Sequence, residues 1–155
     1  MNNQNMNNIT AATNESHEIA INITRKAFIG LARQGMLFHQ GVLEGCDDAL
    51  AAALAGEKAR ICVALAPDAD KNYIHLAVAD WGCGMDLAAL TNALQLGSAP
   101  LTNSRLNEHG YGLNNALACL SGGTGDWCIY TRSQPGPYYK VSGPFDLKMT
   151  VTEED

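Results

Sequence analysis

Three carboxylates stand close together in the stretch Glu44-Gly-Cys-Asp47-Asp48-Ala49. A helix would place Glu44 and Asp48, one turn apart, on the same face, with Asp47 beside them. Like charges at this spacing repel one another, and a hydrated Mg²⁺ would relieve the repulsion because it prefers oxygen ligands and keeps several waters. A solvated acidic face is the simpler alternative for the cluster taken alone.

A second group of residues, Asp80-Trp81-Gly82-Cys83-Gly84-Met85, comes directly after an apolar run. The aspartate offers an acceptor beside backbone that can approach a flat ligand closely, since glycine has no Cβ and tolerates positive φ. A plain glycine-rich turn initiated by the aspartate is the alternative for this segment.

The third group is His109-Gly110-Tyr111-Gly112-Leu113, a glycine-rich turn that leads into an expected helix. The free N–H groups and the dipole at a helix N-terminus favour phosphate. The chain has no GxxxxGK[ST] segment, and Asn115 stands where a GxGxxG motif needs its third glycine. The usual P-loop and dinucleotide-binding motifs are therefore excluded.

The order of these groups, from Glu44 to Arg132, resembles the GHKL superfamily of ATPases, whose ATP-binding domain is histidine-kinase-like. Gly97-Ser98 and the stretch 128–132 most resemble the MORC and heat-shock chaperone branch. The resemblance implies the Bergerat fold. This is an α+β fold, a two-layer α/β sandwich with a mixed, mainly antiparallel sheet, helices on one face and an ATP lid, here at 96–109.

The resemblance also implies ATP and Mg²⁺ as cofactors, and a role for each motif residue. Glu44 would be the catalytic general base that orients the attacking water, Asp48 would stand at the magnesium position, and Asp80 would accept a hydrogen bond from the adenine amino group. Further nucleotide contacts are implied for Gly82, Gly84, Met85, Gly110, Tyr111, Gly112 and Leu113, and Thr131 resembles the family's late threonine that supports the adenine-binding aspartate.

Two positions depart from the family pattern: Asp48 replaces an asparagine, and Ala51 replaces an aspartate. Arg105, in the expected lid, is a candidate substitute for the lysine that some relatives supply from a following domain, and an exposed loop arginine is the favoured alternative. We therefore expect Mg·ATP binding with slow hydrolysis, coupled through lid closure to a protein partner or to a homodimer. A degenerate nucleotide-binding module that does not hydrolyse ATP is one alternative.

A histidine or serine protein kinase module is the other alternative. Ser16-His17-Glu18-Ile19 is similar to the phospho-accepting motif of sensor kinases, but no proline follows it. Only 26 residues separate His17 from Glu44, too few for the helical hairpin that carries such a histidine in that family.

The elements that must position these residues follow from the apolar pattern. A helix-friendly stretch at 24–54 is interrupted by glycines, which predicts two helices. A hairpin is expected from 60–66 and 73–79, ending at Asp80, and Asp86 should cap a helix over 86–96. The remaining expected elements are a short strand at 19–23, a helix at 113–120 and strands at 127–132, 138–141 and 145–151.

Composition sets the remaining expectations. The 155 residues fit one domain at 15–155 behind a disordered, Asn-rich tail at 1–14. No apolar run approaches the roughly 20 residues of a membrane helix, and no secretory signal is present, so we expect a cytoplasmic protein. The net charge is −6 with scattered basic residues, which gives no direct nucleic-acid signal. The five cysteines are expected to be buried, reduced thiols.

Overall fold

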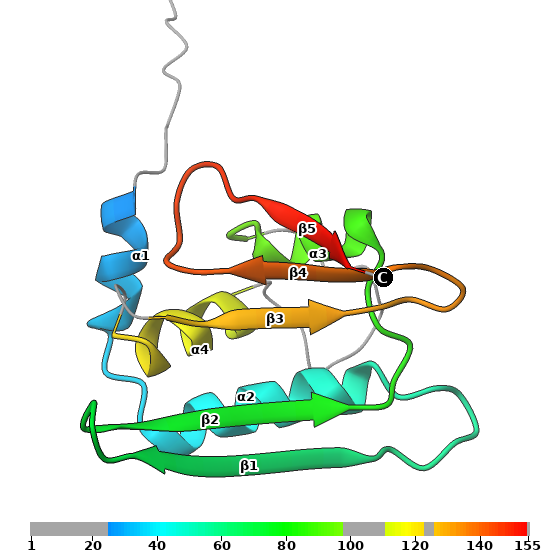
Figure 1. The fold of residues 1–155 in the computed structure, drawn as a ribbon, viewed down its shortest axis with the longest axis horizontal. Helices are drawn as coiled ribbons and strands as arrows, with labels where there is room; N and C mark the ends of the chain where they lie inside the picture. The colour runs from blue at the N-terminus through cyan, green and yellow to red at the C-terminus, as the bar shows by residue number, and fades with distance from the viewer. Residues whose placement is uncertain (1–24, 98–110, 123–125, 155) are drawn as a thin grey trace, which may run out of the picture.

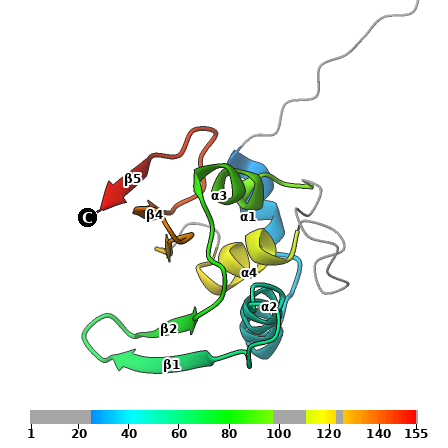
Figure 2. The same ribbon diagram turned by 90° about the vertical axis from the view of Figure 1, so that its right-hand side faces the viewer.

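The computed structural model describes residues 25–97, 111–122 and 126–154. Within these ranges the chain is α+β, with four helices and two small antiparallel sheets, and the helices lie on one side of the strands (Figure 2). The elements follow in the order α1 (Arg25–Ala32), α2 (Phe38–Ala51), β1 (Ile61–Asp68), β2 (Tyr73–Asp80), α3 (Leu87–Leu94), α4 (Gly112–Leu120), β3 (Cys128–Thr131), β4 (Tyr138–Ser142) and β5 (Val151–Glu154).

The predicted pair of helices, α1 and α2, is confirmed, and the break between them lies at Gly35. Gly35 adopts a φ of +78°, which only glycine reaches at little cost. The Gln40 side chain then accepts a hydrogen bond from Leu37 N–H at 2.8 Å, which satisfies one free donor where α2 begins.

Two glycines inside α2 allow α4 and β2 to pack closely against this helix. A Cβ on Gly41 would lie 2.9 Å from Leu120 Cγ of α4, and one on Gly45 would lie 3.3 Å from Val78 Cγ2 of β2. Both distances are tighter than ordinary contacts, so α2 sits closer to α4 and β2 than a larger residue would allow. The helix that carries the acidic cluster is therefore fixed against both layers.

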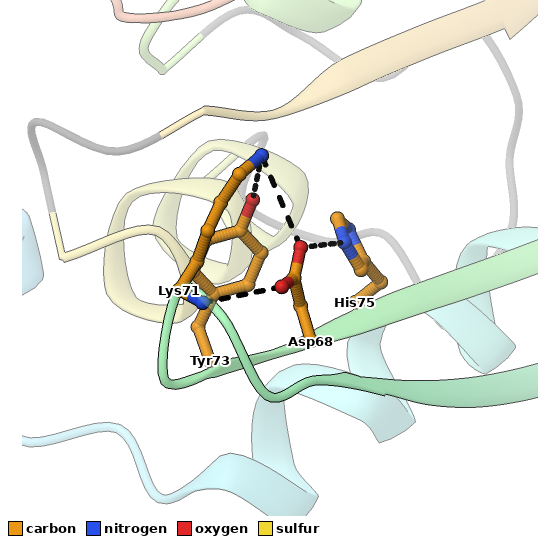
Figure 3. A network of polar contacts seen from close by, with 4 residues as sticks. All are labelled: Asp68, Lys71, Tyr73 and His75. Atoms are coloured by element: carbon orange, nitrogen blue, oxygen red, sulfur yellow. Dashed lines mark hydrogen bonds and ion pairs between the residues drawn. The ribbon is translucent and has the colours of Figure 1, made fainter.

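The hairpin of β1 and β2 is confirmed, with a register running from Ile61 opposite Asp80 to Asp68 opposite Tyr73. A polar network holds its turn (Figure 3). Asp68 Oδ2 lies 3.4 Å from His75 Nε2, and Lys71 Nζ donates to Tyr73 Oη at 3.1 Å. That hydrogen bond raises the pKa of Lys71.

The second sheet has the order β3-β4-β5. Tyr130 pairs with Lys140, and Lys140 with Thr152. Because side chains alternate along a strand, Val141 points to the helices, where it is 1% exposed, and Lys140 points away from them. We call the face that carries Tyr130, Lys140 and Thr152 the outer face.

The strand predicted at 145–151 is wrong for most of its length, because β5 begins only at Val151. Phe145 instead turns into the core, where it is 2% exposed. Its ring stacks on Phe28 of α1 at 4.3 Å and lies 4.5 Å from Trp127. The connection from β4 to β5 is therefore held by the buried Phe145 ring and not by strand pairing.

The single mixed sheet expected from sequence is divided into two antiparallel sheets in the described residues. In Figure 1, β3 is the next strand drawn beyond β2 and points the same way, although the two strands do not pair. Where they end, the backbone N–H of Met85 donates to Thr131 Oγ1 at 2.8 Å. A side-chain hydrogen bond thus links the two sheets.

Helices α3 and α4 complete the helical layer. Asp86 caps α3 as predicted, since its Oδ1 accepts from Ala89 N–H at 2.8 Å. Leu90 of α3 is fully buried, and α4 buries Ala116 and Ala118. In the described part of the chain, each helix is too short or too polar to cross a membrane.

Several expectations lie outside the described residues: the tail at 1–14, the strand at 19–23, His17, Gly110 and the greater part of the lid with Arg105. The cysteines differ from expectation. Cys62, Cys83 and Cys128 are exposed and the other two half-buried, because the strands and loop that carry the exposed three are covered on one side at most.

Candidate functional site

The carboxylate of Glu44 lies against the first residue of α4. A Cβ placed on Gly112 would overlap Glu44 Oε2 and lie 3.2 Å from its Cδ. Glycine at 112 therefore makes room for the acid. A carboxylate is favoured here, because the free N–H groups at a helix N-terminus carry partial positive charge. The predicted general base and the predicted phosphate-binding turn are thus adjacent.

Asp48 lies one helical turn further along α2. Its Oδ2 is buried and accepts no hydrogen bond from any described residue. Burial, and after it the charges of Glu44 and Asp47, together raise the pKa of Asp48 to about 6. Such an acceptor has the chemistry of a cation ligand, since a bound cation would offset both the burial and the repulsion.

Asp80 initiates a tight turn whose shape depends on glycine. Its Oδ1 accepts a hydrogen bond from Gly82 N–H at 2.7 Å. The next residue, Cys83, donates its N–H to the carbonyl of Ala52 at 2.8 Å, and a Cβ on Gly82 would overlap that carbonyl. The loop after β2 is therefore docked on the C-terminal end of α2, the helix that carries Glu44 and Asp48.

Gly84 and Met85 attach the same loop to the end of β3. Gly84 has a φ of +62°, and a Cβ there would overlap the carbonyl oxygen of Arg132. Thr131 accepts the Met85 N–H, so it supports the loop that begins at Asp80 through Met85. Gly84, the glycine expected to let a flat ligand pack against backbone, thus packs closely on the backbone of Arg132.

The two ends of the predicted lid meet beside α4. Gly97, with a φ of +71°, is so close to the Tyr111 ring that a Cβ on it would lie 2.7 Å from Tyr111 Oη. The described residues on either side of 98–110 therefore lie together, and Tyr111 is followed directly by Gly112, which Glu44 contacts. Leu113, in the first turn of α4, is half-buried.

Cavities of very different size lie near the loop after Asp80 and in the second sheet. A hollow of only about 10 Å³ borders Gly82 and Trp81, whereas a cavity of about 480 Å³ lies in the β4–β5 region. In the same ranges, no three His, Cys, Asp or Glu side chains gather as a metal site. The acidic cluster alone therefore does not form a metal cage, and Asp48 would need ligand oxygens from a phosphate or water.

Asn114 is a residue that the sequence reasoning missed. It is fully buried in α4, its Nδ2 donates to the carbonyl of Ala93 at 3.1 Å, and its Oδ1 has no partner among the described residues. The available signal was the pair Asn114-Asn115 between Leu113 and Ala116 in an otherwise apolar helix, of which Asn114 falls on the buried side.

Comparison with known proteins adds no family. Neither the protein-family models nor the curated proteins contain a match to this chain. The assignment to the GHKL superfamily stays a prediction from the motifs.

Proposed function

We propose that this domain binds Mg·ATP and hydrolyses it slowly. The observation that carries the proposal is the contact between the Glu44 carboxylate and Gly112 at the N-terminus of α4. It joins an acid able to accept a proton from water to the part of the chain best suited to hold phosphates.

Each remaining motif supports this arrangement. Backbone amides around Tyr111, Gly112 and Leu113 would hold the phosphates, and Asp80 with its docked loop would receive the adenine. Asp48 would hold Mg²⁺ together with phosphate oxygens and water, which suits its buried, unpartnered Oδ2. The metal would neutralise charge on the transferred phosphoryl group.

We propose the Bergerat sandwich as the finer description of the fold. In its favour, helices lie on one side of both sheets, and β2 and β3, although unpaired, point in the same direction. The predicted lid at 96–109 would close beside Glu44, since Gly97 and Tyr111, on either side of 98–110, lie together. Ordering of such a segment by a γ-phosphate is an established type of switch, through which a partner or a second copy would sense nucleotide.

A binding module that holds nucleotide without hydrolysis is the second candidate, favoured by the charge at position 48. An aspartate adds a negative charge beside the triphosphate, and the raised pKa of Asp48 reflects burial first and then two neighbouring acids that already oppose its ionisation. The two candidates share the binding site and differ only in turnover.

Calorimetric titration with a non-hydrolysable ATP analogue, with and without Mg²⁺, tests the binding. We expect the wild type to bind and Asp80→Asn to bind at least about tenfold more weakly, because the amide presents a donor where the adenine amino group needs an acceptor. Asp70→Asn, an equal charge change in the exposed hairpin turn, is the matched control. No binding by the wild type would overturn the proposal.

A further inference from the structure

The outer face of the β3–β4–β5 sheet carries two exposed tyrosines, each with a cation over its ring. Tyr130 is 60% exposed and Tyr138 is 42% exposed. Lys140 Nζ lies 5.1 Å from the centre of the Tyr130 ring, and Arg132 Cζ lies 4.3 Å from that of Tyr138. Aromatic and cationic groups thus alternate across β3 and β4.

A cavity that adjoins this face is lined mainly by cationic and hydroxyl side chains. Lys140, Ser142 and Thr152 come from β4 and β5, and Lys148 and Thr150 come from the connection between these strands. Its volume is about 480 Å³, enough for a phosphate with its sugar. Ammonium groups and hydroxyls are the donors that phosphate oxygens accept from.

We propose that this outer face binds single-stranded nucleic acid, with bases stacked on Tyr130 and Tyr138 and phosphates held at Lys140 and Lys148. Exposed rings on a sheet can stack on unpaired bases, whereas the bases of a duplex are already stacked on each other. A base that stacks on either ring would take the place of the cation over it, and that cation would then lie next to the phosphates of the base.

The charge of the whole chain does not oppose this assignment. The net charge is −6, but at physiological salt the Debye length is about 8 Å, so distant carboxylates are largely screened. The strand register places one acid, Glu154, opposite Tyr138 at the end of this face. The three cations follow one another at intervals of eight residues, at Arg132, Lys140 and Lys148. This spacing explains why no basic cluster is visible in the sequence.

The outer face is distinct from the proposed nucleotide site. Thr131 and Val141 alternate with Tyr130 and Lys140 and point to the helical side, where Thr131 contacts Met85. The proposal therefore does not depend on ATP binding.

Fluorescence anisotropy with labelled oligothymidylate and oligouridylate of about 20 nucleotides, at two salt concentrations, tests the inference. We expect Tyr130→Ala and Tyr138→Ala each to weaken binding about tenfold, and Tyr130→Phe to keep it, because the ring stacks without its hydroxyl. Lys148→Ala should lower the slope of log affinity against log salt by about 0.7. Lys26→Ala on α1, on the helical side, is the charge-matched control and should change neither quantity.

The DNA and RNA probes distinguish the two sources of the same chemistry, and tighter binding of oligouridylate would indicate a contact to the 2′-hydroxyl. Tyr130→Phe and Lys148→Ala change an exposed ring and a loop cation, so they remain informative if an alanine variant at a tyrosine unfolds. The proposal is overturned by absence of saturable binding, by a duplex bound as tightly as the single strands, by equal losses in Lys26→Ala, or by binding to phosphatidylserine vesicles without binding to oligonucleotides.

Discussion

Asp48 is a charged residue in a place that disfavours its charge. Its pKa is raised to about 6, first by burial and then by Glu44 and Asp47. A carboxyl group with a higher pKa in the folded state holds its proton more tightly there than in the unfolded chain. Its ionisation therefore destabilises the fold above pH 6, and this penalty disappears as the pH falls towards 3.8.

We expect Asp48→Asn to raise the free energy of unfolding of the metal-free protein at pH 8. The gain should be on the order of 1 kcal/mol after allowance for partial exposure, and it should vanish near pH 4. Urea unfolding of the wild type, Asp48→Asn and Asp47→Asn at both pH values measures it. A destabilised Asp48→Asn at pH 8 would show that the carboxylate is stabilised by a contact other than those of the described residues.

A substitution at Glu44 tests ATP hydrolysis separately from ATP binding. Glu44→Gln keeps the shape of the side chain against Gly112 but removes its ability to accept a proton. We expect phosphate release to fall about 100-fold or more while affinity for the ATP analogue changes little. Glu57→Gln, an exposed position after α2, is the control. Equal, slow release from the wild type and Glu44→Gln would favour the non-hydrolysing module.

At the scale of elements, the glycines in the loop after β2 restrict its position, because they allow it to pack closely on neighbouring backbone. Gly84 combines a φ of +62° with close approach to the Arg132 carbonyl. We expect Gly84→Ala to cost about 2–4 kcal/mol, from left-handed strain and from overlap. Gly30→Ala, inside α1 with no atom near the added Cβ, should instead stabilise by about 0.5–1 kcal/mol. Thermal or urea unfolding of both variants gives the two signs.

Two other glycines, inside α2, illustrate what could not be predicted from the sequence. The hairpin, the cap at Asp86 and the helix after Gly112 follow from local patterns, because apolar period and capping chemistry are properties of neighbouring residues. Gly41 and Gly45 were expected to interrupt a helix, yet they lie inside α2. Their role depends on Leu120 and Val78, which are distant in sequence.

At the scale of the whole molecule, the motifs that could be recognised in the sequence lie on the helical side. The residues of the outer face could not be recognised from the sequence. Glu44 and Gly112 could be singled out because each belongs to a short segment of recognisable type. Tyr130, Lys140 and Lys148 become neighbours only through strand register and the return of the chain after β4. Nothing local to any of them indicates a shared surface.

The same connection after β4 holds the helical layer to the second sheet, since Phe145 stacks on Phe28 of α1 and contacts Trp127. We expect Phe145→Ala to lower the free energy of unfolding by about 3–5 kcal/mol, because it removes a buried ring and leaves a cavity. Leu147→Ala, two residues away and 67% exposed, should change it by less than about 0.5 kcal/mol. Urea unfolding followed by circular dichroism compares the two. If Phe145→Ala cost no more than Leu147→Ala, this ring would not join the layers, and the second sheet would have to be held by the Met85–Thr131 link and the remaining core contacts alone.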